Sequence, residues 1–309
     1  MNCSTALPKA LPKALPLVYD SVLGVETLAA LRGCVEDFAV YRGKSCERLL
    51  GFWLPREAEV KTAPELVGRK LLEHLNLKDL DIEWWCRCQE KSLGAHFHYD
   101  THPFLDAKHS HLRPLFSSVF YLTDAGGPTV VLEQQAHGAG HWPAVPERGY
   151  AVASRGNRWF LFPGLLRHGA VAINESQTAQ NALSNALSNE AERTRRQVIL
   201  FNFWPKETPR SPQCVQPDFS SYKPTCSWAP TQRHILSKAE LQRLQDEKAN
   251  LQRILPLKLK KFEEMSHSVP MEDHPALPMP SADAFKTGTG FVELHWRCAA
   301  QSYLSAKGD

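Results

Sequence analysis

Short apolar runs, several of them alternating with polar residues, dominate the chain between Asp81 and Trp204. Alternation with a period of two residues is typical of strands that bury one face. Turn-forming pieces such as DAGGP at 124–128 separate several of the runs. This region therefore predicts an antiparallel sandwich or barrel. The runs are IEWWCRC, GAHFHYD, SSVFYLT, TVVLE, GYAVA, RWFLF, GAVAI and QVILFNF.

Helical patterns flank this strand-rich region. Apolar residues recur at helical spacing from Val25 to Phe38, and TAPE at 62–65 supplies a Thr cap, a first-turn Pro and a Glu three residues after the cap. Further along, Ser237 and Glu240 form a second capping box, and leucines then mark one side of a helix expected at about 238–255. The predicted fold class is α+β, with the helices outside the strands.

Composition shifts divide the chain into segments. Residues 6–16 repeat ALPK with a proline every fourth position, which predicts a disordered leader over residues 1–20. The polar, asparagine-rich stretch at about 174–195 predicts a flexible insertion. We expect the main domain to span 21–210 and a C-terminal extension to span 211–309.

Charge and cysteine usage exclude several classes of protein. With 36 basic and 33 acidic residues in 309, the net charge of +3 argues against nucleic-acid binding and offers no basic membrane-binding surface. No apolar run approaches the ~20 residues of a membrane helix. The eight cysteines are scattered, and alternation explains Cys86 and Cys88 as same-face strand residues. We predict a soluble, intracellular, cytoplasmic protein, and the acid-free start leaves an organellar transit peptide open.

The stretch GAHFHYDTH at 94–102 carries the strongest chemical signal. His98 and Asp100 are two apart, so a strand would present both to one ion, and in principle His96 as well. A third ligand, His168, follows an apolar strand and a Pro-Gly turn. Two imidazoles and a carboxylate with open opposite positions suit a non-haem Fe(II) site. We rank His96 as a support for the ligands rather than a ligand.

Four ordered pieces between 82 and 204 resemble the Fe(II)- and 2-oxoglutarate-dependent oxygenases, especially the prolyl-4-hydroxylase-like branch. They are HYD, SSVFYLTDAGGPTVV, FLFPGLLRHG and RRQVILFNFW. The resemblance implies a double-stranded β-helix, a jelly-roll or cupin-like barrel, that uses Fe(II), dioxygen and 2-oxoglutarate as cosubstrate. It also implies hydroxylation with release of succinate and carbon dioxide. His98, Asp100 and His168 would be the iron ligands.

The same resemblance assigns the cosubstrate contacts. Arg196 would bind the distal carboxylate of 2-oxoglutarate, and Tyr121 would hydrogen-bond the same group. Physical chemistry supports an arginine, because a planar guanidinium binds a carboxylate through two parallel hydrogen bonds. In a regular strand position 196 is in phase with Val198, whereas Arg195 faces the other way. The substrate, an unidentified peptide side chain or small molecule, cannot be named from the sequence.

Two other functions stay open at this point. A cupin-type metal enzyme would use His96, His98 and His168 without 2-oxoglutarate. A catalytically silent barrel would act as an interaction module, with the helix at 238–255 as its contact surface. That helix would also offer a surface for a homodimer.

Overall fold

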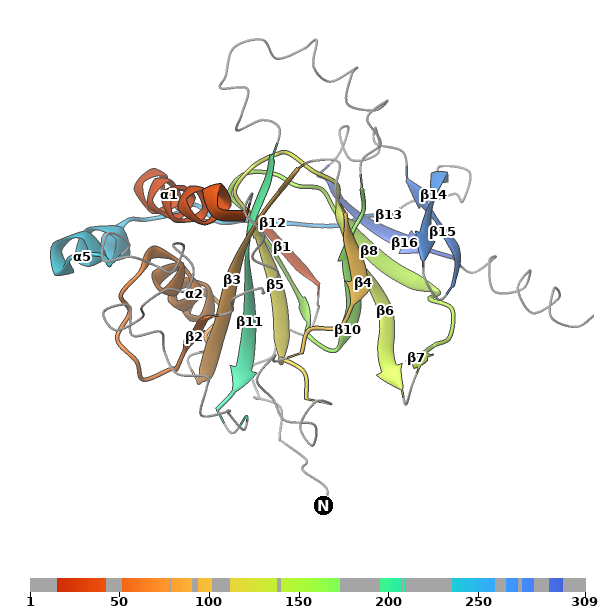
Figure 1. The fold of residues 1–309 in the computed structure, drawn as a ribbon, viewed down its shortest axis with the longest axis horizontal. Helices are drawn as coiled ribbons and strands as arrows, with labels where there is room; N and C mark the ends of the chain where they lie inside the picture. Colours follow the sequence, from red (N-terminus) through yellow and green to blue (C-terminus); the bar gives the residue numbers. More distant parts are fainter. Residues whose placement is uncertain are drawn as a thin grey trace, which may run out of the picture.

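The computed structural model shows mostly antiparallel sheets with few helices (Figure 1). It describes residues 16–42, 52–77, 79–90, 94–101, 112–137, 140–172, 195–206, 208, 235–258, 265–271, 274–280 and 289–296. The insertion expected at about 174–195 lies outside these residues except for Arg195, and so do residues 1–15 of the expected leader. No helix within the described part of the chain is both long and apolar enough to span a membrane.

The first sheet, sheet A, has seven strands in the order β12-β1-β9-β5-β11-β3-β2. All its neighbouring strands are antiparallel. Its strands are β1 (Leu17–Asp20), β2 (Phe52–Leu54), β3 (Leu80–Glu90), β5 (Phe116–Tyr121), β9 (Arg158–Pro163), β11 (Arg195–Pro205) and β12 (Gln252–Ile254).

The second sheet, sheet B, has the strand order β13-β16-β8-β6-β10-β4, and β7 pairs with the C-terminal end of β6. Only the β13–β16 pair among its described ladders is parallel. A separate hairpin is formed by β14 (Met265–Met271) and β15 (His274–Pro280). The strands of sheet B are β4 (Ala95–His98), β6 (Thr129–His137), β7 (Gly140–Trp142), β8 (Arg148–Val152), β10 (Leu166–Ala170), β13 (Leu257–Lys258) and β16 (Phe291–His295).

The two sheets pack face to face over a shared apolar cluster, which we call the interior. Alternation along each strand sends every second residue into it. Its buried members from sheet A are Val18, Val119, Tyr121, Phe160, Phe162 and Val198, and those from sheet B are Val131, Val152 and Phe291. Functional side chains that share this phase on their strands therefore face one common space.

The helices lie on the other face of sheet A (Figure 1). They are α1 (Val25–Arg42), α2 (Ala63–His74) and α5 (Lys238–Asp246). The first two pack on the sheet around a second apolar cluster, and the last packs against the second helix. The prediction of two helices before the histidine cluster is confirmed, including the capping box that Thr62 and Glu65 form at the start of α2. Cys86 and Cys88 pack against this same cluster, which agrees with their interpretation as same-face strand residues.

The C-terminal residues depart from the predicted extension. The helix starts at the expected capping box but ends at Asp246, well before 255. Glu247 leaves the helix because its carboxylate accepts hydrogen bonds at 2.8 Å from the backbone N–H groups of Glu26 and Thr27 at the start of α1. Residues beyond it join sheets A and B as β12, β13 and β16, so tertiary pairing overrides helical periodicity here. A homodimer through α5 stays a prediction.

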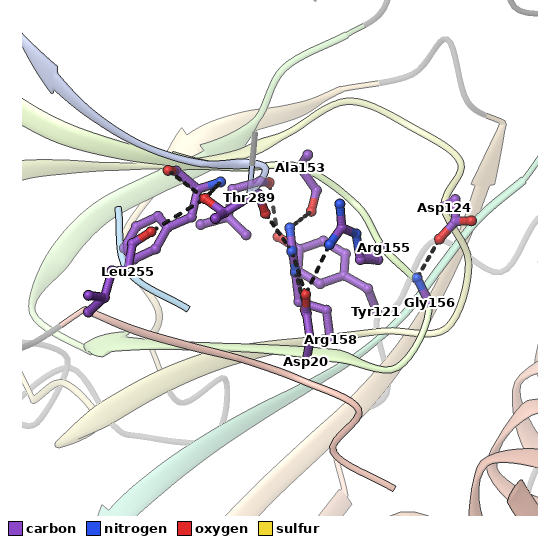
Figure 2. Close-up of polar contacts among 11 residues, drawn as sticks. Asp20, Tyr121, Asp124, Ala153, Arg155, Gly156, Arg158, Leu255 and Thr289 are labelled. Atoms are coloured by element: carbon purple, nitrogen blue, oxygen red, sulfur yellow. Dashed lines mark hydrogen bonds and ion pairs between the residues drawn. The ribbon is translucent and has the colours of Figure 1, made fainter. Parts of the chain in front are cut away.

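The predicted leader is wrong for residues 17–20, which form β1 between β9 and β12. Leu17 and Val18 are buried on opposite faces of sheet A, so this short segment contributes to two apolar clusters. Asp20 accepts hydrogen bonds from Nε and Nη2 of the fully buried Arg158 at 2.6 and 2.9 Å (Figure 2). The strand is held by this ion pair as well as by its ladders.

We expect replacement of Asp20 by Ala to lower the free energy of unfolding by about 3–5 kcal/mol, because it leaves the buried Arg158 guanidinium without its counter-charge. Arg155 offers a matched control on the same carboxylate. It contacts Asp20 at 3.1 Å but its side chain is 47% exposed, so Arg155→Ala should lose less than about 1 kcal/mol. Urea unfolding of the variants measures both values. Equal losses of unfolding free energy in the two variants would show that the buried Asp20–Arg158 pair contributes no more than the exposed Arg155 contact.

Candidate metal centre

Three predicted metal ligands meet on the interior side of sheet B. His98 on β4 and His168 on β10 are direct cross-strand partners, and Asp100 follows β4 by two residues. The Nε2 atom of His98 lies 3.7 Å from Asp100 Oδ1, and that of His168 lies 3.5 Å from Asp100 Oδ2. Their ligand atoms all lie within 4.8 Å of one another, the one such group of three or more His, Cys, Asp or Glu residues among those described.

Neighbouring groups fix the orientation of all three side chains. Nδ1 of His98 lies 2.7 Å from the carbonyl oxygen of His96, and Nδ1 of His168 lies 3.0 Å from that of Leu166. A proton on each Nδ1 leaves Nε2 as the free lone pair, directed toward Asp100. Ser117 Oγ donates to Asp100 Oδ2 at 2.7 Å, which holds the carboxylate from sheet A.

Electrostatics in the cluster match a site built for a cation. Burial raises the pKa of Asp100, but the His168 and His98 imidazoles outweigh this effect and hold it well below its usual range. Burial lowers the pKa of His168, whereas Asp100 raises it, and the net direction is upward. The negative charge of Asp100 that raises the pKa of His168 would equally favour a metal cation beside these nitrogens.

Ser117→Ala should weaken Fe(II) binding by roughly tenfold to a hundredfold, since groups that orient metal ligands contribute on that scale. The hydroxyl bonds Asp100, so its effect would pass through the orientation of this carboxylate. Ser118→Ala on the same strand is the control, because its hydroxyl bonds the carbonyl of Phe201 and not a ligand. Equal affinity in the Ser117 variant and the wild type would contradict this role.

A buried arginine lies at the other end of the interior. Arg196 on β11 is 4% exposed, its Nη2 donates to Thr129 Oγ1 at 2.9 Å, and its guanidinium carbon lies 5.6 Å from the centroid of the Tyr121 ring. Burial lowers its pKa. Its Nε has no hydrogen-bond partner in the described part of the protein. Arg195, in contrast, is exposed.

Gly126 in the DAGGP turn makes room for this arginine. A Cβ added to Gly126 would lie 2.5 Å from Cδ and 2.6 Å from Cβ of Arg196, and the glycine has a φ of +92°. A larger residue would therefore collide with the stem of the arginine and strain the backbone as well. The turn fixes the path that carries the guanidinium into the interior.

Within the protein, the hydroxyl of Tyr121 bonds a threonine. It donates to Thr129 Oγ1 at 2.6 Å, so the proton is directed at a threonine. Thr129 accepts from both Tyr121 and Arg196, and the Tyr121 hydroxyl also lies 3.4 Å from the carbonyl oxygen of Val152. Thr129 is a site residue that sequence reasoning missed, because it is simply the first residue of an apolar strand.

The pairing of Arg158 shows what Arg196 lacks. Arg158 is the cross-strand partner of Tyr121 and is also fully buried. Its guanidinium donates to both oxygens of Asp20 and to the carbonyl oxygens of Ala153 and Thr289 (Figure 2). Two buried arginines thus flank one tyrosine, and only one of them has a carboxylate in the described residues. A buried cation without a counter-charge is costly and indicates a site for an anion.

The pairing of β6 with β10 gives the spacing between Thr129, which Arg196 contacts, and the metal ligand His168. Thr129 and Val131 share the interior face of β6, and Val131 is the cross-strand partner of His168. Two residues of strand span about 7 Å. An anion held at Thr129 and Arg196 could therefore extend toward the metal ligands if it had the length of a five-carbon chain.

The other histidines stay outside the ligand group. The side chain of His96 is exposed and outside the ligand group, and its carbonyl oxygen lies beside Nδ1 of His98. His141 Nδ1 lies 2.9 Å from the hydroxyl of Tyr99, and His137 is exposed at the end of β6. Three further histidines, His102, His109 and His111, lie outside the described residues.

A buried carboxyl near the metal ligands was also missed by sequence reasoning. Glu83 on β3 is 4% exposed, and its Oε2 accepts from Trp204 Nε1 at 2.8 Å and Asn202 Nδ2 at 3.2 Å. Burial, opposed by these two bonds and reinforced by Asp100, raises the pKa of Glu83 to about 8. The alternation in IEWWCRC predicts on which face of the strand Glu83 lies. Nothing in that stretch indicates that this face is buried.

Glu83 should make stability depend on pH. Its folded pKa of about 8 is above the ordinary 4.5, so the folded state holds the proton more tightly and stability falls as pH rises from 4.5 through 8. The full loss is on the order of 4–5 kcal/mol. Glu83→Gln should remove this loss, so the variant should gain stability over the wild type as pH rises. Urea unfolding of metal-free protein at a series of pH values tests it, and parallel profiles would contradict it.

Comparisons with known proteins give structural likeness alone. No protein-family model and no curated protein sequence matches the chain. Among solved structures, a Pseudomonas putida prolyl-4-hydroxylase is 16% identical, with a TM-score of 0.37, and the match covers 61% of this chain and 91% of that one. HygX from Streptomyces hygroscopicus, with nickel and 2-oxoglutarate bound, is 14% identical, with a TM-score of 0.34 and coverage of 62% and 83%.

A viral collagen prolyl hydroxylase from Paramecium bursaria chlorella virus-1, in complex with 2-oxoglutarate, is 13% identical. Its TM-score is 0.35, and the match covers 62% of this chain and 97% of that one. Identities and TM-scores at this level do not define what the chain does. Its function has to follow from its own side chains.

Proposed function

We propose that the chain is an Fe(II)- and 2-oxoglutarate-dependent oxygenase, a hydroxylase, built on a double-stranded β-helix. One observation carries this proposal: the interior holds both a His-Asp-His group whose ligand atoms lie within 4.8 Å of one another and a buried arginine that has no carboxylate partner among the described residues. Either feature alone would be compatible with a different function. Together they supply the metal site and the anion site that this chemistry requires.

The ligand set fits Fe(II). His98 and His168 offer Nε2 lone pairs fixed by their Nδ1 contacts, and Asp100 offers a carboxylate held by Ser117. Two imidazoles and one carboxylate leave several coordination positions for other ligands, as non-haem Fe(II) oxygenases require. Iron bound there would use dioxygen and 2-oxoglutarate to hydroxylate a C–H bond of the substrate, with release of succinate and carbon dioxide.

The anion site fits the remote carboxylate of 2-oxoglutarate. Arg196 would neutralise it with charge-assisted hydrogen bonds from Nε and the terminal nitrogens. Thr129 would donate its remaining hydroxyl proton to the same group, and Tyr121 would hold Thr129 in place. The apolar side chains between this end and the metal ligands exclude water from the cosubstrate.

Binding of 2-oxoglutarate to the Fe(II)-loaded protein without oxygen provides the direct test. The matched ligand is 2-oxobutyrate, which keeps the keto acid but lacks the remote carboxylate. We expect calorimetry to show much tighter binding of 2-oxoglutarate, and a screen of substrates under oxygen to find substrate-dependent succinate formation. Equal affinity for the two keto acids would remove the reason to invoke Arg196 as the anchor.

The alternative of a cupin-type enzyme with His96, His98 and His168 as ligands has weaker support. The side chain of His96 is exposed, and the group of close ligand atoms contains Asp100 in its place. A catalytically silent barrel is disfavoured by the intact His-Asp-His group. Neither alternative accounts for the uncompensated charge of Arg196.

A further inference from the structure

We infer that Glu83 and Asn202 form a substrate-binding subsite for a basic group, an alkylammonium or guanidinium, on the substrate of the proposed oxygenase. That the ligand is a substrate rests on the proposed function. The subsite itself is argued from charges and hydrogen bonds. It names a chemical class of substrate that the metal and cosubstrate sites leave undefined.

The position of the pair places it beside the metal ligands. Asn202 on β11 is the cross-strand partner of Glu83 on one side and of Ser117 on the other. Ser117 bonds the metal ligand Asp100, and Asp100 acts electrostatically on Glu83. Arg196 lies six residues away on β11, roughly 20 Å along the strand. The pair is thus at the metal end of the interior, away from the anion site.

Unsatisfied groups show that something is missing from this pair. Glu83 forms no ion pair with any cation of the described chain, and both hydrogen bonds it accepts fall on Oε2. Asn202 is 2% exposed, and its buried Oδ1 has no hydrogen-bond partner in the same set of residues. Asn202 Oδ1 is therefore a buried acceptor that lacks a donor among these residues, whereas Glu83 accepts through only one of its two carboxyl oxygens. An unpaired buried acceptor has a free-energy cost that a ligand with N–H donors would relieve.

Two indoles lie beside the pair, and the carboxyl has no cation opposite it in the described chain. Trp204 donates to Glu83, and its ring lies 6.0 Å from that of Trp53, the cross-strand partner of Glu83 on the edge strand β2. Because burial raises the pKa of Glu83 to about 8, the carboxyl holds its proton at neutral pH. A basic group bound there would supply the counter-charge that the ionised carboxyl lacks.

A test in the full-length chain needs neither iron nor 2-oxoglutarate. The probe is n-butylguanidinium, compared with the neutral n-pentanol, and the readout is the indole N–H resonance of Trp204 in nitrogen-15 NMR, because that group donates to Glu83. We expect a saturable shift with the guanidinium and none with the alcohol. Glu83→Gln should weaken binding of the probe at least about tenfold, the effect of losing a charge-assisted contact.

Two further variants keep the result interpretable. Glu65→Gln is the matched control, because Glu65 is also a buried carboxyl with a raised pKa but accepts from the backbone N–H groups of Lys61 and Thr62. It should leave probe binding unchanged. Asn202→Ala should weaken binding as well, and it serves if the Glu83 variant does not fold.

Defined outcomes would overturn the inference. They are the absence of a saturable shift, an equal response to the alcohol, or equal probe affinity in the wild type and the Glu83 and Asn202 variants. Each would leave Glu83 a purely structural carboxyl and would leave the oxygenase proposal standing. Loss of 2-oxoglutarate binding, conversely, would end the oxygenase proposal without affecting the measured subsite.

Discussion

Replacing Asp100 by Ala should weaken Fe(II) binding by more than about a hundredfold. Groups that merely orient a ligand contribute tenfold to a hundredfold, and Asp100 is the only carboxylate in the ligand group, so its loss should exceed that range. It removes a negative charge that the buried site supplies against the charge of the ion. Metal titration under anaerobic conditions measures the change, and circular dichroism of the metal-free protein checks that the variant folds.

His96→Ala is the informative control for this experiment. The side chain of His96 is exposed, and alanine retains the backbone carbonyl that lies beside Nδ1 of His98. The variant should therefore bind Fe(II) within a few-fold of the wild type. Comparable losses in the His96 and Asp100 variants would favour the three-histidine ligand set of a cupin-type enzyme.

The His-Asp-His group was predictable because its members can be recognised from residue type and local spacing. His98 and Asp100 share a strand face by alternation, and His168 follows an apolar strand, so three residues could be named before their distances were known. The pairing of His98 with His168 across β4 and β10 was not predictable, since register depends on tertiary contacts. The residue types defined the candidates, and the sheet brought them together.

Residues whose role depends on burial were not found from the sequence. Glu83 and Thr129 are ordinary members of strand patterns, and only the packing of sheet A against sheet B removes them from water. For the same reason β1 was assigned to a leader, although Asp20 at its end pairs with the buried Arg158. The end of α5 was missed because strand pairing of β12 outweighs the leucine periodicity that continues past Asp246.

Arg196→Ala should raise the dissociation constant for 2-oxoglutarate by a hundredfold or more. Removing one partner of a buried, hydrogen-bonded charge pair costs about 3–5 kcal/mol, and each 1.4 kcal/mol is a factor of ten. The ligand carboxylate would then be buried with Thr129 as its remaining donor. Calorimetry on the metal-loaded variant measures the loss.

Iron affinity separates this effect from general damage to the site. Arg196 contacts Thr129 and Tyr121, and neither belongs to the ligand group, so Fe(II) binding should change little. The variant should also unfold no more easily in the absence of ligand, because it removes a buried cation that has no counter-charge in the described chain. Loss of 2-oxoglutarate affinity without loss of stability in the ligand-free variant would identify Arg196 as a binding residue.

Arg195→Ala completes the set. Its side chain is exposed and on the opposite face of β11, while its carbonyl, which alanine retains, accepts from Thr123. We expect cosubstrate affinity within a few-fold of the wild type. If affinity falls in this variant and survives in Arg196→Ala, the strand is shifted by one residue relative to the interior. If neither substitution matters, the buried charge of Arg196 serves another anion, and the metal ligands alone cannot support a requirement for 2-oxoglutarate.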